Sequence, residues 1–235
     1  MKKVLFGIFA HPDDEAFGPS ASLYKSAQSG TDVHLIVVTD GEKGANPDND
    51  SNLGALRIKE WQKSSSLIGA TSTKALHYPD GKLCSDNYLS IANEILAHIR
   101  KVLSSYTTPA SIDFMTFDYQ GISGHLDHIA ASMIATYVYL ELKKDLSVNT
   151  SVNRLKYFCL SEALAPSANT SWIYMPAGKH HAHIDEEVHY EDIAEKKLEI
   201  MNAHHSQRAD CASILAQRSH LSEHDKYCDH FHYFK

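Results

Sequence analysis

Blocks of apolar residues separated by mixed segments predict strands and helices in turn along the chain. Short continuous runs of apolar and β-branched residues are typical of strands that are buried on both faces, as in a parallel sheet. Five runs read as such strands: VLFGIFA (4–10), VHLIVVT (33–39), the shorter KALHY (74–78), SIDFMTF (111–117) and RLKYFCL (154–160).

Helices are predicted between the strands, at 14–29, 52–68, 85–103 and 125–144. The clearest is 85–103, for which Ser85 is the expected N-cap. Its apolar residues recur at three- and four-residue spacing on one face: Leu89, Ala92, Leu96, Ile99 and Leu103.

The C-terminal third is less regular. Residues 161–190 contain one possible extra strand at 171–177, and 191–216 reads as helical. The segment 219–235 is rich in histidine and aromatic residues and is expected to be a tail outside the domain 1–218.

Regular alternation of strand and helix predicts an α/β fold, a Rossmann-like, doubly wound and mostly parallel sheet with helices on both faces. The 235 residues, 43% of them hydrophobic, are enough to bury the core of a single domain.

Composition narrows the classes of function. With 22 Lys+Arg against 29 Asp+Glu, the formal charge of −7 disfavours binding to nucleic acid or to an anionic membrane. The four cysteines are scattered without a CxxC pair, so neither a disulfide framework nor a zinc–thiolate site is indicated, and we expect a reducing, cytoplasmic location. A homo-oligomer is left open.

An unusual polar cluster follows the first predicted strand. HPDDE (11–15) brings His11, Asp13, Asp14 and Glu15 together, which is costly to bury unless a positive ion lies among them. Pro12 favours a strand that ends at His11 and a helix that starts at Pro12, with both aspartates in its first turn. A metal site is one reading, and an ordinary acidic helix start is the other.

A second cluster, GISGHLDHIA (121–130), follows the fourth predicted strand and carries His125, Asp127 and His128. If the first and fourth strands are neighbours, both clusters meet at the point where the strand order reverses, which is where open parallel sheets bind ligands. Two histidines and a carboxylate around an ion, with positions left open, are typical of a catalytic metal site.

The two clusters together resemble the PIG-L-like (LmbE-like) zinc-dependent N-acetylglucosamine deacetylases. The family's secondary motifs also have counterparts here in matching order: TDGEKG (39–44), LRIKE (56–60), DGKL (80–83), and HHSQ (204–207) after Lys197. Two positions depart from the family pattern. Leu126 stands where the second motif usually has proline, and Ser123 stands where some relatives carry a tyrosine that assists the reaction.

The resemblance implies a role for each residue of the two clusters. His11, Asp14 and His128 hold Zn²⁺, or another divalent ion such as Fe²⁺, and Asp13 is the general base for the attacking water. A protonated His125 stabilises the oxyanion, and Asp127 holds His125 in that state. Glu15 is expected to be a solvated acid or an indirect support.

The resemblance also implies substrate contacts. Asp80, in the turn PDG, is expected to bind sugar hydroxyls, and Arg57 to bind the substrate near its anomeric side. The plainer alternatives are an Arg57–Glu60 pair within one helix and an ordinary Asp–Gly turn. The expected activity is removal of the N-acetyl group from a small N-acetylglucosamine-containing molecule or glycoconjugate.

Other classes of function are less well supported. A dinucleotide-binding oxidoreductase should show G-x-G-x-x-G after the first strand, where this chain has HPDDE. A noncatalytic carbohydrate-binding protein has no need for a base beside three metal ligands. A metal-dependent amidase or esterase with a non-sugar substrate stays open. The histidines of KHHAHIDEEVH (179–189) and CDHFH (228–232) are expected to be solvated, with only adventitious metal binding.

Overall fold

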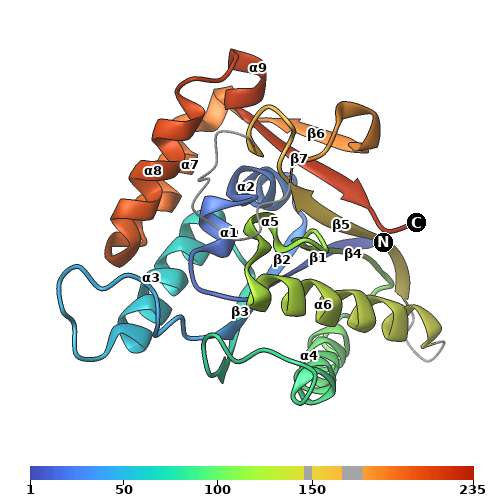
Figure 1. The fold of residues 1–235 in the computed structure, drawn as a ribbon. Coiled ribbons are helices and arrows are strands. Elements are labelled where there is room, and N and C mark those ends of the chain that lie inside the picture. The colour runs from blue at the N-terminus through green and yellow to red at the C-terminus, as the bar shows by residue number, and fades with distance from the viewer. Residues whose placement is uncertain (146–149, 166–176) are drawn as a thin grey trace.

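A computed structural model describes residues 1–145, 150–165 and 177–235. Its centre is a seven-stranded sheet in the order β3-β2-β1-β4-β5-β7-β6 (Figure 1). The first five strands in this order, β3, β2, β1, β4 and β5, are parallel to one another. Strand β7 runs antiparallel to both β5 and β6. The strand bounds are β1 Lys2–Phe9, β2 Asp32–Thr39, β3 Ser72–Tyr78, β4 Ala110–Phe117, β5 Thr150–Cys159, β6 Glu186–His189 and β7 Cys228–Tyr233.

The predicted α/β architecture is confirmed, including the adjacency of β1 and β4. Strands β2 and β3 follow β1 on one side of it, and the chain then crosses to place β4 and β5 on its other side. The strand order therefore reverses at the β1/β4 pair. The carboxyl ends of these two strands are therefore the expected place for a ligand.

Helices cover both faces of the sheet (Figure 1). Helices α4 (Tyr88–Leu103) and α6 (Leu126–Lys144) pack on one face, where the apolar core includes Ile95, Ile99 and Ile134. The helices on the other face and at the sheet ends are α1 Asp14–Phe17, α2 Ser20–Gln28, α3 Leu53–Ile68, α5 Gly121–Gly124, α7 Ala194–Asn202, α8 Arg208–Arg218 and α9 Glu223–Lys226, with short 3₁₀ turns η2 His181–His183, η3 Glu191–Ile193 and η4 His205–Gln207. Among the described residues, no helix is long and apolar enough to cross a membrane.

Several predicted helices differ in detail from the structure. The segment 14–29 forms two helices, α1 and α2, separated by Gly18 and Pro19. Helix α4 begins at Tyr88 with Asn87 at the N-cap position, so the prediction of Ser85 as N-cap is wrong. Leu89 is 55% exposed, because the buried stripe of α4 is completed by Ile91 and Ile95 instead.

The C-terminal part contributes more to the sheet than its sequence indicates. Residues 186–189 of the segment expected to be a solvated loop form the edge strand β6. The segment from Ser219 supplies β7, which lies between β5 and β6, so the division expected at Ser219 marks no boundary in the sheet. The extra strand predicted at 171–177 lies, apart from its last residue, outside the described residues.

Candidate metal centre and active site

The turn between β1 and α1 carries the first cluster in an unusual backbone conformation. Helix α1 begins at Asp14, two residues later than the predicted start at Pro12. Asp13 is its N-cap residue with φ 109°, a left-handed conformation that is costly for a residue with a side chain. Such conformations cluster at functional sites, where the surrounding contacts enforce them.

Donor atoms of three residues from the two clusters, His11, Asp14 and His128, converge at the carboxyl ends of β1 and β4. Nδ1 of His11 lies 3.1 Å from Nε2 of His128, and that same Nε2 lies 3.2 Å from Oδ1 of Asp14. Oδ2 of Asp14 lies 3.8 Å from Nδ1 of His11. Ligand atoms ~2.1 Å from a tetrahedral ion are about 3.4 Å apart, so these separations suit a shared divalent cation.

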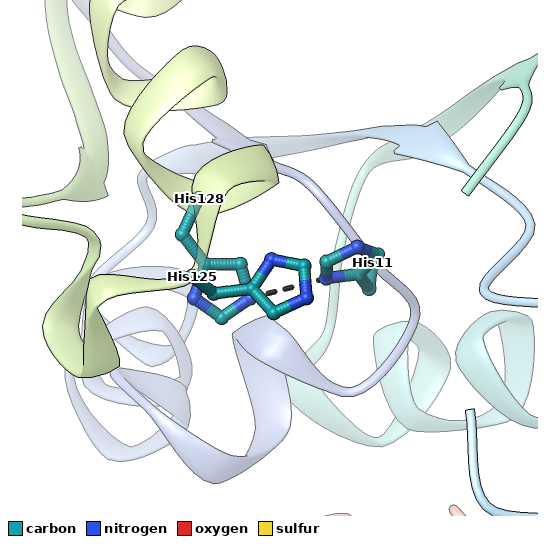
Figure 2. A group of neighbouring side chains, drawn as sticks. All are labelled: His11, His125 and His128. Atoms are coloured by element: carbon teal, nitrogen blue, oxygen red, sulfur yellow. Dashed lines mark hydrogen bonds between the residues drawn. The ribbon is translucent and has the colours of Figure 1, made fainter. Parts of the chain in front are cut away.

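A third imidazole flanks this group of donors. His11, at the end of β1, faces His125 and His128 from the start of α6, and the dashed line in Figure 2 joins His11 to His128. Each of the three rings offers a nitrogen within 4.8 Å of the others. The structure therefore gives an ion more than one possible set of ligands at this position.

Second contacts fix which nitrogen each ring presents. Nδ1 of His128 lies 3.1 Å from the carbonyl of Gly121, which accepts its proton and leaves a lone pair on Nε2. Nε2 of His11 lies 3.0 Å from Asp80 and 3.3 Å from Asp127, so its proton points to these carboxylates and Nδ1 faces Asp14 and His128. Histidines that ligate a metal are commonly oriented in this way by an acceptor on the outer nitrogen.

Burial and charge act against each other at these ligands. Burial alone disfavours the charged forms, but Asp127 and Asp80 raise the pKa of His11 to about 10. Burial likewise opposes ionisation of Asp14, yet His128 and His11 lower the pKa of that carboxyl well below its usual range. Backbone N–H groups of Ala10 and His11 also donate to Oδ2 of Asp14, at 3.1 and 2.8 Å. A cation held by these groups would replace the Nδ1 proton of His11.

Asp13 is held beside the donors by Arg57. The Nη2 group of Arg57 donates to Oδ2 of Asp13 at 2.7 Å, and the guanidinium also donates to the carbonyls of Gly41 and Pro12. Burial raises the pKa of Asp13 to about 6, although the Arg57 charge acts in the opposite direction. A carboxyl with such a pKa is suited to accept and return a proton near neutral pH.

Two glycines in the loop after β2, Gly41 and Gly44, leave the space that the Arg57 guanidinium occupies. Gly41 has φ 65°, and a Cβ atom there or at Gly44 would collide with the guanidinium. The structure does not have the alternative ion pair between Arg57 and Glu60 as their main contact. Glu60 instead accepts hydrogen bonds from the backbone N–H and the hydroxyl of Ser206, at 2.8 and 2.6 Å.

The carboxylate of Asp127 has a different partner from the expected one. The carboxylate accepts hydrogen bonds from the backbone N–H groups of Gly81 and Leu83 at 2.7 and 3.2 Å, and it contacts His11. Asp127 contacts His125 through its backbone N–H instead. That N–H donates to Nδ1 of His125 at 3.2 Å, so the neutral ring carries its proton on Nε2. Burial and the neighbouring His128 lower the pKa of His125, which disfavours the protonated form expected from the sequence.

Asp80 contacts the metal site more directly than the sequence indicates. Its Oδ1 lies 3.0 Å from Nε2 of His11, and its Oδ2 accepts from the backbone N–H of Lys43 at 3.0 Å. Although burial opposes ionisation, these contacts lower the pKa of Asp80 to about 2. It is therefore an ionised acceptor at the floor of the site.

A buried polar network beneath the site was not predicted. Of the two expectations for Glu15, a solvated position is wrong and an indirect support agrees with the structure. The residue is fully buried and contacts Ser64, Nε2 of His204 at 2.9 Å, and the backbone N–H of Asp13 at 3.2 Å. The motif HHSQ gave a signal for His204, but its partner is 189 residues away in sequence and required the fold.

The donors open into a cleft of about 640 Å³, within the range of small-molecule sites. Its lining includes the apolar side chains of Phe117, Ile122, Phe158 and Leu160, together with Lys43, Gln207 and residues of α8. Ser123 also lines the cleft, whereas the side chain of Leu126 is 76% exposed. Apolar walls with convergent polar groups at one end are typical of an enzyme site.

The fold and this site define an α/β protein with histidine and carboxylate donors at the switch point of a parallel sheet. The chain belongs to the GlcNAc-PI de-N-acetylase (PIG-L) family, which matches residues 6–139. The deacetylases of this family are metal-dependent, and the donors described above are compatible with that requirement.

Individual relatives agree with the family. The chain is 32% identical over 139 residues to a probable N-acetylglucosaminyl-phosphatidylinositol de-N-acetylase of Schizosaccharomyces pombe, covering 55% of this chain and 49% of that protein. It is 31% identical over 136 residues to the diacetylchitobiose deacetylase of Thermococcus kodakarensis, covering 57% and 48%. The chain thus spans about half the length of these curated relatives.

The fold extends beyond the matched sequence. The structure of N,N'-diacetylchitobiose deacetylase from Pyrococcus horikoshii, with an inhibitor bound, superposes with a TM-score of 0.71 at 20% identity. The alignment covers 99% of this chain and 84% of that one, so it includes β6 and β7.

Proposed function

We propose that the protein is a metal-dependent N-deacetylase that hydrolyses the acetamide of a small N-acetylglucosamine-containing molecule or glycoconjugate. The observation that carries the proposal is the convergence of His11 Nδ1, His128 Nε2 and the Asp14 carboxylate next to Asp13, at the base of an open cleft. The named relatives act on N-acetylglucosamine compounds, which supports this class of substrate.

In this proposal His11, Asp14 and His128 hold the ion, and their nitrogen and oxygen donors suit Zn²⁺ or another divalent ion such as Fe²⁺. When bound, such an ion lowers the pKa of water and polarises a carbonyl oxygen. Asp80 and Asp127 keep the His11 ring in the tautomer that presents Nδ1.

Asp13 takes the proton of the attacking water, and Arg57 holds Asp13 in place and keeps it ionised. His125 donates a hydrogen bond from Nε2 to the oxyanion that forms as water adds to the acetamide carbonyl. Protonation of the leaving nitrogen by Asp13 then breaks the C–N bond and gives acetate and a free amine. A neutral His125 can fill this role, so a protonated ring is not needed.

We propose a revised division of the substrate contacts. The Arg57 guanidinium already donates to three oxygens of the protein, which favours a positioning role for it over direct binding of the sugar. Asp80 lines the cleft and could still accept from a ring hydroxyl with a second lone pair. Recognition of the rest of the substrate falls to the apolar lining of the cleft and α8. A cytoplasmic location stays a prediction.

The proposal is tested by acetate release from four substrates: N-acetylglucosamine, diacetylchitobiose, an acidic N-acetylglucosamine conjugate and a simple acetamide. Equal amounts of acetate and free amine from the sugars, with at least tenfold lower kcat/KM for the acetamide, are expected. A non-sugar amide or ester as the best substrate would favour the alternative of a metal-dependent amidase or esterase. No hydrolysis of any of the four by zinc-loaded protein would contradict the proposal.

A further inference from the structure

A second group of side chains of the types that ligate metals lies at the far edge of the sheet, on the β6/β7 pair. In the antiparallel register Glu187 is opposite His230, and His189 is opposite Cys228. Because alternate residues of a strand point to the same face, these four side chains share one face of the strand pair. The sequence places the two segments about 40 residues apart, and only the sheet brings them together.

Two more histidines from outside the sheet approach the same carboxylate. His181, in η2, places Nδ1 at 3.2 Å from Oε1 of Glu187, and His224, in α9, places Nε2 at 3.5 Å from Oε2. Nε2 of His189 lies 3.9 Å from Oε2 of the same residue, and the rings of His189 and His224 are 4.6 Å apart at their centroids. Glu187 is thus surrounded by three imidazoles.

A buried thiol completes the cluster. One donor atom each from Glu187, His189 and Cys228 lies within 4.8 Å of the others, and the side chain of Cys228 is fully buried. Three exposed histidines around a carboxylate could be ordinary surface ion pairs, which contribute little to stability. A thiol at the base of the cluster adds a soft donor that such pairs do not use.

The unpartnered state of a neighbouring histidine is an independent observation. His230 is 2% exposed, and within the described part of the chain its buried Nε2 has no hydrogen-bond partner. Its ring centroid lies 6.3 Å from that of His181. A buried nitrogen without a partner is costly, and a water molecule bound to a nearby cation would satisfy it.

We propose that Glu187, His189, His224 and Cys228 form a second divalent-cation site, distinct from the catalytic centre, that binds Zn²⁺. Imidazole, carboxylate and thiolate are donors that zinc accepts together in closed, four-ligand structural sites. His181 lies close enough to Glu187 to orient it or to exchange with another ligand. Binding forms a Zn–S bond, breaks the S–H bond of Cys228 and releases that proton to solvent.

The site has a structural use. Strand β6 has only four residues and forms the open edge of the sheet, and α9 is a single turn. An ion bound by residues of β6, β7 and α9 would tie these short elements together. It would stabilise the folded state by mass action, because the ligands are scattered in the unfolded chain.

The experiment measures zinc content of protein without a histidine tag, after loading with ZnSO₄ and gel filtration in metal-free buffer. Wild type should keep a second equivalent of zinc, whereas the exposed double variant His189→Ala/His224→Ala should keep only one. The matched control is His180→Ala/His183→Ala, which removes two exposed histidines of the adjacent segment and should bind as wild type does.

His128→Ala serves as the background in which the catalytic ion is absent. There, zinc at 100-fold its Kd should raise the Tm by about 5–10 °C, and the added double substitution should remove that rise. With Co²⁺ in place of zinc, a thiolate-to-metal absorption band should be present and should disappear in Cys228→Ala.

Equal zinc content in the cluster variant and the control would overturn the second site, as would retention of only one equivalent by wild type. The proposed function fails in a different way, namely if His128→Ala keeps full catalytic-centre zinc or wild type releases no acetate. The two sites are therefore tested separately. Acetate release by the cluster variant should match that of its control.

Discussion

Replacement of Arg57 by methionine tests how the protein controls its general base. The Nη2 of Arg57 and Oδ2 of Asp13 are 2.7 Å apart, and the Asp13 side chain is only 14% exposed, so solvent screens the pair weakly. Arg57→Met keeps most of the side-chain volume and removes the charge. Asp13 then loses its nearest cation, and its ionised form becomes less favourable.

The size of the effect follows from Coulomb's law. Unit charges about 4 Å apart interact by ~4 kcal/mol at an effective dielectric constant of 20, an upper value equal to about 3 pKa units. Observed effects of one opposite charge are about 1–3 units. Starting from the pKa of about 6 that burial gives Asp13 despite Arg57, the loss of Arg57 raises the pKa further. A cation bound at the site lowers the pKa of Asp13 in wild type and in Arg57→Met alike, so the pKa difference between the two proteins remains.

The assay is the pH profile of kcat/KM for acetate release. Because the carboxylate is the active form of a base, activity falls about tenfold per pH unit below its pKa, and the acidic limb should move upward by about 1–3 units in Arg57→Met. Arg57→Lys keeps the charge and should shift the limb much less. Zinc content and Tm identify a variant that has lost the fold.

An acidic limb in Arg57→Met that coincides with that of wild type, at equal zinc content, would refute the reasoning. Asp13 would then be either not the base or not governed by Arg57. A similar shift in Arg57→Lys and Arg57→Met would assign the effect to the hydrogen-bond geometry rather than to charge.

Three further predictions concern other parts of the molecule. Asp127→Asn should weaken zinc affinity about 10- to 100-fold, measured by competition with a chelator, because it supports the His11 ring; unchanged affinity would remove it from that role. His125→Ala should lower kcat about 100-fold or more while zinc stays bound, and a kcat equal to wild type would exclude it from oxyanion stabilisation. Asp229→Ala should lower the free energy of unfolding by about 3–5 kcal/mol in urea titrations, because it leaves the buried Lys197 ammonium, 2.8 Å away, without its partner; a loss below about 1 kcal/mol would contradict this.

The sequence was informative where a signal is local. Apolar runs indicated the five parallel strands, and polar residues directly after the first and fourth strands indicated His11, Asp14 and His128, because parallel strands end at the same edge of a sheet. The left-handed conformation of Asp13 could not be read from HPDDE, since proline there favours an earlier helix start.

Partnerships between distant residues required the fold. The contacts of Asp127 and Asp80 with His11 join three segments of the chain, and the sequence instead suggested a histidine of the same motif, His125, as the partner of Asp127. The histidines of the two histidine-rich segments were expected to be solvated, but His230 is buried. Their pattern has no helical spacing, and only the pairing of β6 with β7 places Glu187 opposite His230.

The central claim is that the ligands and the base are separate residues of one centre. It is tested most directly by zinc content and acetate release measured together on wild type, Asp13→Asn and His128→Ala. We expect that Asp13→Asn keeps its zinc and loses nearly all turnover, since the amide cannot accept a proton, whereas His128→Ala loses the catalytic ion itself. Loss of the catalytic-centre zinc from Asp13→Asn together with its retention by His128→Ala would contradict it.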